Sequence, residues 1–201
     1  MPSSFWIIVL IKDFTTAKSR LAPVLGPLPR RRLAEMTAAR ALDAALALAP
    51  TLAVCGAEEA ADLARLRGAA LVVERSPSGQ NEAAARGLVE VMQRGAEAAL
   101  LLSSDLPLVD EAALRRLLAQ TDAPGGIVVA AAADGRQGTN ALYLRPPGDF
   151  SLHFGAASLP KFAQEARLRG RRFIVHDDPR LALDLDEPSD LSAWRRLEPT
   201  G

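Results

Sequence analysis

The sequence predicts an α/β fold with a mixed, mostly parallel sheet, on three observations. The apolar runs are short and continuous, as in strands that are covered on both faces. Helical patterns alternate with these runs through the first two thirds of the chain, which is typical of parallel strands joined by crossovers. Later runs follow one another in pairs, so we expect antiparallel strands there. No linker or change in composition divides the chain, and we expect one domain over residues 1–201.

The expected strands begin with a run of seven apolar residues and continue with shorter ones. In chain order they are Phe5–Ile11, Thr51–Cys55, Ala70–Val73, Ala98–Leu102, Ile127–Ala132, Ala141–Leu144, Arg172–His176 and Leu181–Leu183. The expected helices lie between them, with Asp110 as a cap and Pro160 and Pro188 near helix starts. They are Leu28–Leu48, Glu58–Arg67, Asn81–Arg94, Glu111–Gln120, Ser158–Arg169 and Ser189–Leu197.

The charge balance restricts the classes of partner. The chain has 24 Lys and Arg against 24 Asp and Glu, a formal net charge of zero. A general nucleic-acid or membrane-surface binder needs a broad basic face, so we expect neither kind of partner. A small anionic ligand needs only a local cluster of cations.

Cysteine usage and the N-terminus indicate the compartment. The single cysteine, Cys55, can form neither an intramolecular disulfide nor a cysteine-rich zinc site, and its apolar surroundings favour a buried position. The N-terminus has no basic region, and its apolar stretch reaches Lys12 too soon for a signal peptide. No apolar run approaches the ~20 residues that cross a bilayer. We therefore expect a cytoplasmic protein.

In an open α/β sheet, ligands bind beyond the carboxyl ends of the strands. Lys12, Lys18 and Arg20 follow the first expected strand, mixed with hydroxyl residues. Such a loop can hold a triphosphate by point charges and guanidinium forks, although an ordinary solvated basic loop is an even alternative. The segment has neither a Walker glycine pattern nor GxGxxG, so P-loop and dinucleotide binding are not supported.

Acidic residues follow two other expected strands. Asp105 stands before Pro107 in a turn that can hold Mg2+ or can simply be capped by the aspartate. Asp184 and Asp186 are two residues apart, so on an extended segment their carboxylates point the same way. Like charges so placed are costly unless a cation lies near them, and with Asp105 they could complete an Mg2+ site. An acidic helix N-terminus is the alternative.

Three polar turns are weaker candidates. Gly138-Thr139-Asn140 can expose backbone N–H groups to an anion. Ser78-Gly79-Gln80-Asn81 opens a helix and can contact a base edge or cap that helix. The turn from Phe154 to Ser158 also ends at a helix start, which can bind a carboxylate or phosphate. For each turn alone, a cap is the simpler interpretation.

Taken together, five strings resemble one known family. In order they are Ala17-Lys18-Ser19-Arg20-Leu21-Ala22-Pro23, Ser104-Asp105-Leu106-Pro107, Gly138-Thr139-Asn140-Ala141-Leu142, Phe154-Gly155-x-x-Ser158 and Leu183-Asp184-Leu185-Asp186-Glu187-Pro188. The chain resembles the 2-phospho-L-lactate guanylyltransferases and the related phosphoenolpyruvate guanylyltransferases of coenzyme F-420 biosynthesis. The resemblance covers nearly the whole chain. The Lys-Ser-Arg-Leu and Gly-Thr-Asn-Ala-Leu strings are specific, whereas the Asp-Leu-Pro turn occurs in many nucleotidyltransferases.

The resemblance implies a Rossmann-like nucleotidyltransferase fold, similar to glycosyltransferase A domains. It also implies transfer of GMP from GTP to the phosphate of 2-phospho-L-lactate, phosphoenolpyruvate or 3-phosphoglycerate, with release of pyrophosphate. The family's site residues, carried over by motif, fall into three groups. They are Mg2+ ligands at Asp105, Asp184 and Asp186, nucleotide contacts at Lys12, Lys18, Arg20, Gln80 and Asn81, and acceptor contacts at Thr139, Asn140, Gly155 and Ser158. Lys18, Arg20 and Asp105 would be the catalytic groups.

Two departures from the family pattern lie near the expected acceptor site. Asp134 and Arg136 are displaced from the usual Pro-Asp-Arg string, and Phe162 stands where the family often has His. Because of these departures, the identity of the acceptor stays open. The sequence also does not decide between guanine and other bases, or between a monomer and a homodimer. The alternatives are another nucleotidyltransferase, a glycosyltransferase of the same fold and a non-catalytic nucleotide-binding protein. Enzymes that make molybdopterin guanine dinucleotide usually carry a glycine-rich first loop, which is missing here.

Overall fold

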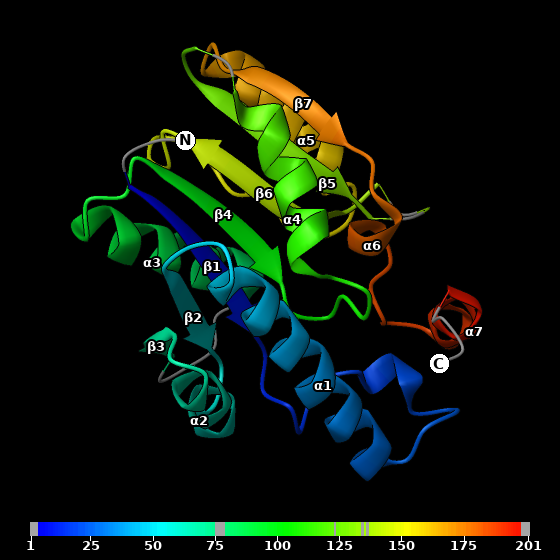
Figure 1. Cartoon of the computed structure of the whole chain (residues 1–201). Helices are drawn as coiled ribbons and strands as arrows, with labels where there is room; N and C mark the ends of the chain where they lie inside the picture. Colours follow the sequence, from blue (N-terminus) through cyan, green and yellow to red (C-terminus); the bar gives the residue numbers. More distant parts are fainter. Residues whose placement is uncertain (1–3, 75–78, 123, 134, 136, 198–201) are drawn as a thin grey trace.

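A computed structural model describes residues 4–74, 79–122, 124–133, 135 and 137–197. Its centre is one seven-stranded sheet in the order β3-β2-β1-β4-β6-β5-β7 (Figure 1). The strands are β1 Phe5–Ile11, β2 Thr51–Cys55, β3 Ala70–Val73, β4 Ala98–Ser103, β5 Ile127–Ala132, β6 Thr139–Arg145 and β7 Arg172–His176. The expected α/β class with a mixed, mostly parallel sheet is confirmed.

One strand is reversed, and it matters for the site. Strands β3, β2, β1 and β4 are mutually parallel, whereas β6 is antiparallel to both of its neighbours, β4 and β5. The register pairs Leu102 near the end of β4 with Ala141 near the start of β6. The beginning of β6 therefore lies at the same edge of the sheet as the carboxyl ends of β1 to β4.

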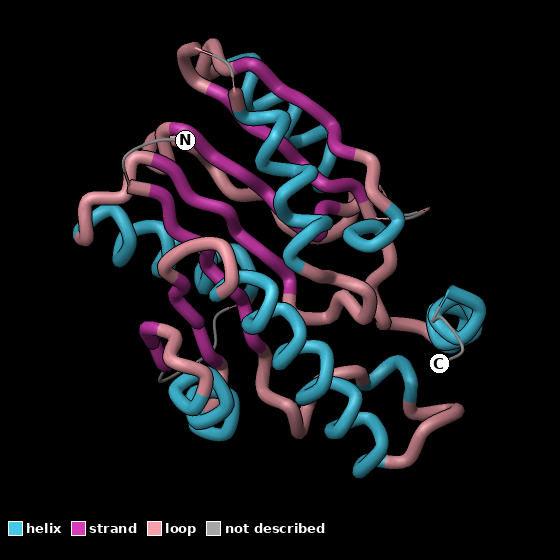
Figure 2. Tube along the Cα trace, viewed as in Figure 1, coloured by secondary structure: helices cyan, strands magenta, loops and turns pink. Residues whose placement is uncertain are grey.

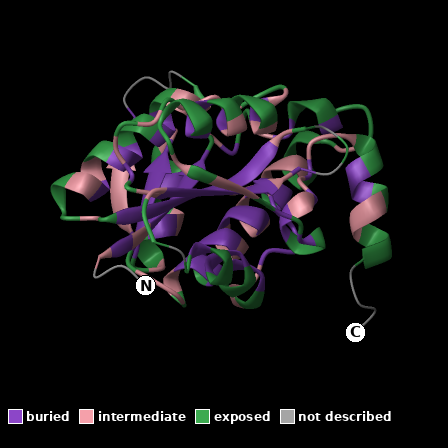
Figure 3. Cartoon of the chain, turned by 90° about the horizontal axis from the view of Figure 1, so that it is seen from above, coloured by how far each residue is buried: buried purple, intermediate pink, exposed green. Residues whose placement is uncertain are grey.

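Helices cover both faces of the sheet, and the alternation along β1 shows how. Ile7 and Val9 point to the face covered by α1 and α4, whereas Ile8 and Leu10 point to the face covered by α3 and α5. Because both faces are buried, β1 reads as a continuous apolar run rather than an alternating one. Figure 3 shows the buried strands between layers of helices whose outer surfaces are exposed.

The helices follow the expected pattern with small changes at their ends (Figure 2). They are α1 Pro27–Leu46, α2 Glu58–Leu66, α3 Gln80–Gln93, α4 Glu111–Leu118, α5 Ser158–Leu168, α6 Pro179–Ala182 and α7 Pro188–Leu197, with short 3-10 turns at Ser19–Leu21 and Ala119–Thr121. The cap expected at Asp110 is confirmed, because its carboxylate accepts a hydrogen bond from the Ala113 backbone N–H at 2.8 Å. No helix in the described part of the chain is long and apolar enough to cross a membrane.

The strand expected over Leu181–Leu183 is wrong. Residues Pro179–Ala182 form the short helix α6, which Asp178 caps by accepting from the Arg180 backbone N–H at 2.9 Å. A run of three apolar residues is too short to tell a strand from a buried helical turn. The aspartate and proline before it form a helix start, and this local chemistry decides the structure.

A small apolar cluster joins the two ends of the chain. Leu21 follows the first loop, Leu33 belongs to α1, and Leu185 and Leu191 flank the start of α7. All four side chains are buried, Leu21 and Leu185 completely. Their packing places the acidic segment before α7 (residues 183–187) beside the basic loop after β1 (residues 12–20). More than 160 residues separate the two in the sequence.

Candidate active site

A cavity of about 570 Å3 lies at the carboxyl edge of the parallel strands. Its lining includes five residues that the sequence analysis selected, and they come from four separate segments. They are Lys12, Lys18, Gln80, Asp105 and Asp186. The fold therefore brings part of the basic loop, the turn after β4, the start of α3 and the acidic segment to one hollow.

Hydrogen bonds to the Asp13 side chain stabilise the loop after β1. The Asp13 carboxylate accepts from the backbone N–H of Thr15 at 2.8 Å and from the Thr15 hydroxyl at 2.7 Å. Phe14 on one side and Leu21 on the other are buried and anchor the loop to the core. Lys18 lies between these anchors, so its position is fixed although it belongs to a loop.

The backbone of Lys18 is left-handed, with φ of 59°, and its side chain is only 6% exposed. That conformation costs a residue other than glycine about 1 kcal/mol or more, and such strain is often retained at functional sites. The ammonium lies 3.8 Å from the Asp105 carboxylate. Burial lowers the pKa of Lys18, and the nearby charges of Asp105, Asp186 and Asp184 offset part of that effect.

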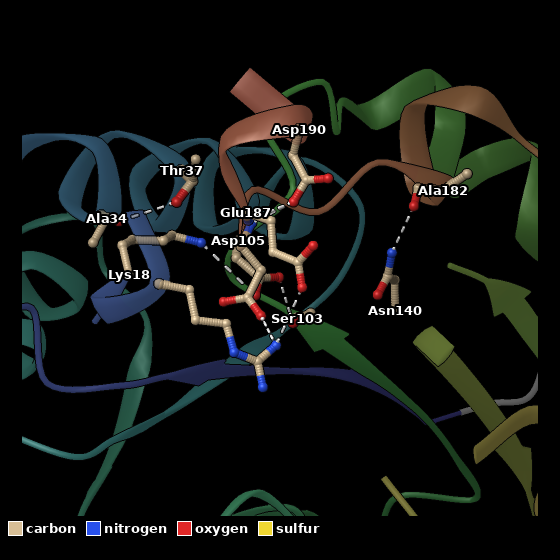
Figure 4. A network of polar contacts seen from close by, with 11 residues as sticks. Lys18, Ala34, Thr37, Ser103, Asp105, Asn140, Ala182, Glu187 and Asp190 are labelled. Carbon is tan, nitrogen blue, oxygen red and sulfur yellow. Dashed lines mark hydrogen bonds and ion pairs between the residues drawn. The ribbon is translucent and has the colours of Figure 1, made fainter. Parts of the chain in front are cut away.

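Two neighbours hold the Asp105 carboxylate, and a third holds the turn that carries it. The Ser103 hydroxyl donates to its Oδ1 at 2.7 Å, while its Oδ2 faces Lys18 (Figure 4). Burial alone would raise the pKa of Asp105, but the Lys18 charge and the Ser103 hydrogen bond outweigh it and hold the pKa below its usual value. The Arg40 guanidinium of α1 donates to the Pro107 carbonyl and so fixes the turn that carries the aspartate. The carboxylate is therefore ionised and oriented at neutral pH.

The acidic segment is tied to this turn through the backbone. The Leu185 N–H donates to the Asp105 carbonyl at 3.1 Å. Beside it, Arg20 donates to Asp186 at 2.7 Å and lies 3.8 Å from Glu187. Arg20 is two-thirds exposed, and its partner Asp186 lines the cavity. Arg20, which is expected to contact the nucleotide, is thus paired with Asp186, which is expected to bind the metal.

Asp190 fixes the acidic segment in a way that the sequence analysis missed. Its buried carboxylate accepts from the backbone N–H groups of Asp186 at 2.9 Å and Glu187 at 2.7 Å. Asp190 is the third residue of α7 and reaches back to the N–H groups at the start of the helix, as in a capping box. The spacing from Glu187 to Asp190 carries this signal in the sequence.

The donor set suits Mg2+ in its chemistry. Mg2+ prefers oxygen ligands and is usually bound through one or two carboxylates together with substrate phosphates. Asp105 and Asp186 supply such carboxylates to one cavity, and each faces a cationic side chain that a phosphate could attract. Among the described residues, no group of three or more His, Cys, Asp or Glu is arranged to hold a metal. Phosphate oxygens would thus have to complete the ligand set.

The expected acceptor residues lie at the same edge, on the far side of β4. The Ser158 hydroxyl donates to the Thr139 hydroxyl at 3.0 Å, and both side chains are buried where α5 meets the start of β6. The Asn140 amide donates to the backbone carbonyls of Leu181 and Ala182 in α6, at 2.9 and 3.0 Å. Asn140 therefore positions α6, from which the acidic segment departs (Figure 4).

Asn81 also makes an internal contact that the sequence did not reveal. Its amide donates to the Phe154 carbonyl at 3.1 Å and accepts from the Phe154 N–H at 2.7 Å. This pair links α3 to the turn in which Gly155, with φ of +119°, needs the freedom of glycine. Phe162 is fully buried against Phe154, so the ring that replaces the family's usual His belongs to the core here.

Three residues from the sequence analysis cannot be placed. Asp134 and Arg136, the displaced residues of the acceptor region, and Ser78 in the turn before α3 lie outside the described residues. Cys55 is buried as expected, and burial raises the pKa of its thiol to about 12.

Known proteins resemble this chain over nearly its full length. It is 38% identical to a phosphoenolpyruvate guanylyltransferase of Rubrobacter xylanophilus, over 98% of this chain and 95% of that protein. It is 33% identical to a 3-phospho-D-glycerate guanylyltransferase of Phenylobacterium zucineum, over 91% of this chain and 86% of that protein. In structure it resembles a nucleotidyl transferase from Methanothermobacter thermautotrophicus, with a TM-score of 0.69 and 18% identity over 96% and 97% of the two chains.

The structural likeness supports the nucleotidyltransferase fold that the motifs implied. The model of the family described as guanylyl transferase CofC-like matches residues 5–194. That span includes every residue assigned to the site, from Lys12 to Asp186. The match and the identity to the relatives together establish membership: the chain belongs to the guanylyl transferase CofC-like family.

Proposed function

We propose that this protein transfers GMP from GTP to the phosphate of a small phosphorylated three-carbon acid, in coenzyme F-420 biosynthesis. The observation that carries the proposal is the cavity where Lys18, Asp105 and Asp186 meet. Such a site offers cations to a polyphosphate and carboxylates to its metal. The names of the relatives support guanylyl transfer and phosphorylated acids as acceptors.

The reaction brings two anions together, so neutralising charge is the main task of the site. An acceptor phosphate oxygen attacks the α-phosphorus of GTP, and the bond from that phosphorus to the oxygen bridging to the β-phosphorus breaks. Pyrophosphate leaves with the electron pair. No general base is required, because a phosphate dianion is already a nucleophile near neutral pH.

In this proposal Lys18 holds its charge against the departing pyrophosphate from a fixed position in the first loop. Arg20 leaves Asp186 and binds the outer phosphates, with Lys12 as a supporting cation. Asp105 and Asp186 would hold Mg2+ together with phosphate oxygens of the substrate, and the family pattern adds Asp184, two residues before Asp186. The ion, when bound, supplies positive charge to the α-phosphate and the acceptor phosphate.

The acceptor occupies the edge beyond β4. The turn at Gly155 and the start of α5 would supply backbone N–H groups to its phosphate or carboxylate, beside the hydroxyls of Thr139 and Ser158. Asn140 contributes by holding α6 and through it the acidic segment. Asn81 contributes in a similar way by holding the Phe154–Gly155 turn.

The test is a pyrophosphate-release assay with GTP and Mg2+. Phosphoenolpyruvate, 2-phospho-L-lactate and 3-phosphoglycerate are supplied one at a time, and the product is identified by mass. We expect pyrophosphate only when an acid is present, together with a product that carries GMP on the acid's phosphate. Binding of GTP without pyrophosphate in any arm would favour a non-catalytic nucleotide-binding protein. Turnover of a sugar nucleotide without pyrophosphate would favour a glycosyltransferase.

A further inference from the structure

Glu74 is a buried acidic residue that the sequence motifs did not single out. It follows β3 and lines the same cavity as Lys18 and Asp105. Its side chain is only 5% exposed, and its Oε1 has no hydrogen-bond partner among the described residues. The Arg86 guanidinium is 3.8 Å from that oxygen, beyond hydrogen-bond distance, and is itself half exposed.

A carboxylate oxygen left in this state is costly. Burying a charged group without hydrogen bonds removes its hydration and returns little in exchange, so native proteins rarely keep one without a reason. Arg86 compensates poorly because it reaches the carboxylate only at long range. A ligand that donates hydrogen bonds inside the cavity would satisfy the carboxylate.

The position of Glu74 selects which part of a nucleotide it would meet. Strands β3, β2, β1 and β4 are adjacent and parallel, so their carboxyl ends form one row (Figure 1). Glu74 stands at the β3 end and Asp105 at the β4 end, three inter-strand spacings or roughly 14 Å apart. A nucleotide whose phosphates lie near Lys18 and Asp105 would extend its base towards Glu74.

The small residues between the two ends suit an extended ligand. Val54, Gly56 and Ala83 line the middle of the cavity. A Cβ on Gly56 would come within 3.3 Å of the Asp13 backbone nitrogen, so the row is tightly packed there. Small residues therefore line the cavity between Glu74 and Asp105, together with Lys12 and Asp13 after β1, and Glu74 lies at the far end of the row.

We propose that the Glu74 carboxylate accepts hydrogen bonds from the N1–H and N2–H2 groups of guanine and thereby selects GTP. This inference rests on the proposed guanylyl transfer. Two adjacent acceptors match the two adjacent donors on that edge of guanine. Adenine and cytosine present, beside their amino group, a ring nitrogen that is a hydrogen-bond acceptor. The carboxylate repels that nitrogen. A site built to hydrogen-bond one partner discriminates strongly against partners that lack the matching groups.

The experiment varies both the hydrogen-bonding edge of the base and the side chain at Glu74. Wild type, Glu74→Gln and Glu74→Asp are compared with GTP, with ITP, which lacks the N2 amino group, and with XTP, which has a carbonyl there. For wild type we expect kcat/KM to fall by about 100-fold from GTP to XTP. In Glu74→Gln the amide can donate to the xanthine carbonyl while its oxygen accepts from N1–H. We therefore expect kcat/KM for XTP, divided by kcat/KM for GTP, to rise by about 100-fold in this variant.

Arg86→Gln is the matched control. It removes the partner cation and leaves the carboxylate, so we expect the wild-type order of nucleotides. If Glu74 served only to pair with Arg86, the two variants would behave alike, and that result would overturn the proposal. An unchanged XTP to GTP ratio in Glu74→Gln would overturn it as well. Should that variant fail to fold, Glu74→Asp decides, because a shortened carboxylate should weaken GTP binding without favouring XTP.

Calorimetric binding of each nucleotide separates this proposal from the proposed function. If the wild type binds GTP at least 10-fold more tightly than XTP, Glu74→Gln loses this preference, and no acid gives pyrophosphate, the guanylyl transfer fails and the role of Glu74 stands. If pyrophosphate is released equally with all nucleotides, the transfer stands and the role of Glu74 fails. If no nucleotide binds, both fail.

Discussion

Arg20 on the loop after β1 donates to Asp186 before α7 at 2.7 Å, across 166 positions of sequence. The pair joins the basic start of the chain to its acidic end, and Asp186 lines the cavity. Residues 177–190 contain six acidic residues and one Arg, while seven of the basic residues lie within the first 50 positions. The zero net charge thus hides two opposite clusters that the fold brings together.

Replacing Arg20 should impair activity without unfolding the protein. Arg20→Gln is expected to lower kcat/KM for GTP by about 100-fold, because a cation that stabilises the departing phosphates is lost. The free energy of unfolding should change by less than about 1 kcal/mol, since the pair is exposed. Steady-state kinetics and urea unfolding measure the two effects. Arg65→Gln, which breaks an exposed pair with Asp62 on α2, is the control and should alter neither.

Replacing Asp105 should remove most turnover. Asp105→Asn keeps the shape and the contact with Ser103 but removes the charge, so we expect kcat to fall by about 1,000-fold or more. Circular dichroism should show an intact fold. Asp43→Asn, on the exposed surface of α1, removes one charge far from the cavity and should keep full activity. Wild-type rates for Asp105→Asn would contradict its assignment.

Lys18 should govern the alkaline side of the pH profile. Its pKa is lowered by burial, so rising pH removes the ammonium charge below the usual 10.5. The profile of kcat/KM, which reports the free enzyme, should therefore fall as pH rises through that lowered pKa. Over the same range Lys18 contributes increasing stability, because the unfolded chain binds the proton more tightly. The loss of activity should thus precede any unfolding.

Lys18→Arg checks this assignment. Arginine stays charged throughout the range, so the alkaline fall should disappear or move upward, even if the rate is lower. A profile with the same fall in the variant would assign it to another group, such as N1 of the base, and would contradict the role given to Lys18.

Asp190 should act through Asp186. Asp190→Ala leaves two backbone N–H groups without their acceptor and is expected to cost about 1–2 kcal/mol of unfolding free energy. It should also raise the Mg2+ concentration needed for half-maximal activity, which a purely structural cap would not do. Asp190→Asn, which keeps an acceptor oxygen, should restore part of both. Asp110→Ala removes the cap of α4 and should lower stability alone; an equal change in Mg2+ dependence there would contradict the account.

Gly87 should resist enlargement. A Cβ at this position of α3 would lie 2.7 Å from Cγ2 of Ile8 in β1. We expect Gly87→Ala to lower the free energy of unfolding by about 1–3 kcal/mol, although alanine has the higher helix propensity. Thermal unfolding measures the effect. At Gly26 a Cβ would meet nothing closer than 3.9 Å, and Gly26→Ala should change stability far less.

The sequence predicts the strands well because their physical cause is local. A strand buried on both faces must be apolar throughout, and Phe5–Ile11 shows this in seven consecutive residues. Leu181–Leu183 fails because three apolar residues suit a strand and a helical turn equally. There the Asp-Pro start was the better guide.

The site is predictable only where a motif names its residues. Lys18, Asp105 and Asp186 could be selected from sequence strings, and they line one cavity. The partners of Asn140 and Asn81 could not, because each hydrogen bond spans 40 or more positions and depends on tertiary packing. Glu74 belongs to no motif, and what distinguishes it is its burial in the cavity with one carboxylate oxygen that has no hydrogen-bond partner among the described residues.

The fate of the α-phosphate tests the central claim most directly. The enzyme is incubated with Mg2+, a phosphorylated three-carbon acid and GTP labelled with 32P at the α-phosphorus. The account predicts that the label moves to the acid, as part of a GMP unit, and that the released pyrophosphate is unlabelled. Label that stays in GTP with every acid, or that appears only in GDP or free GMP, would contradict it.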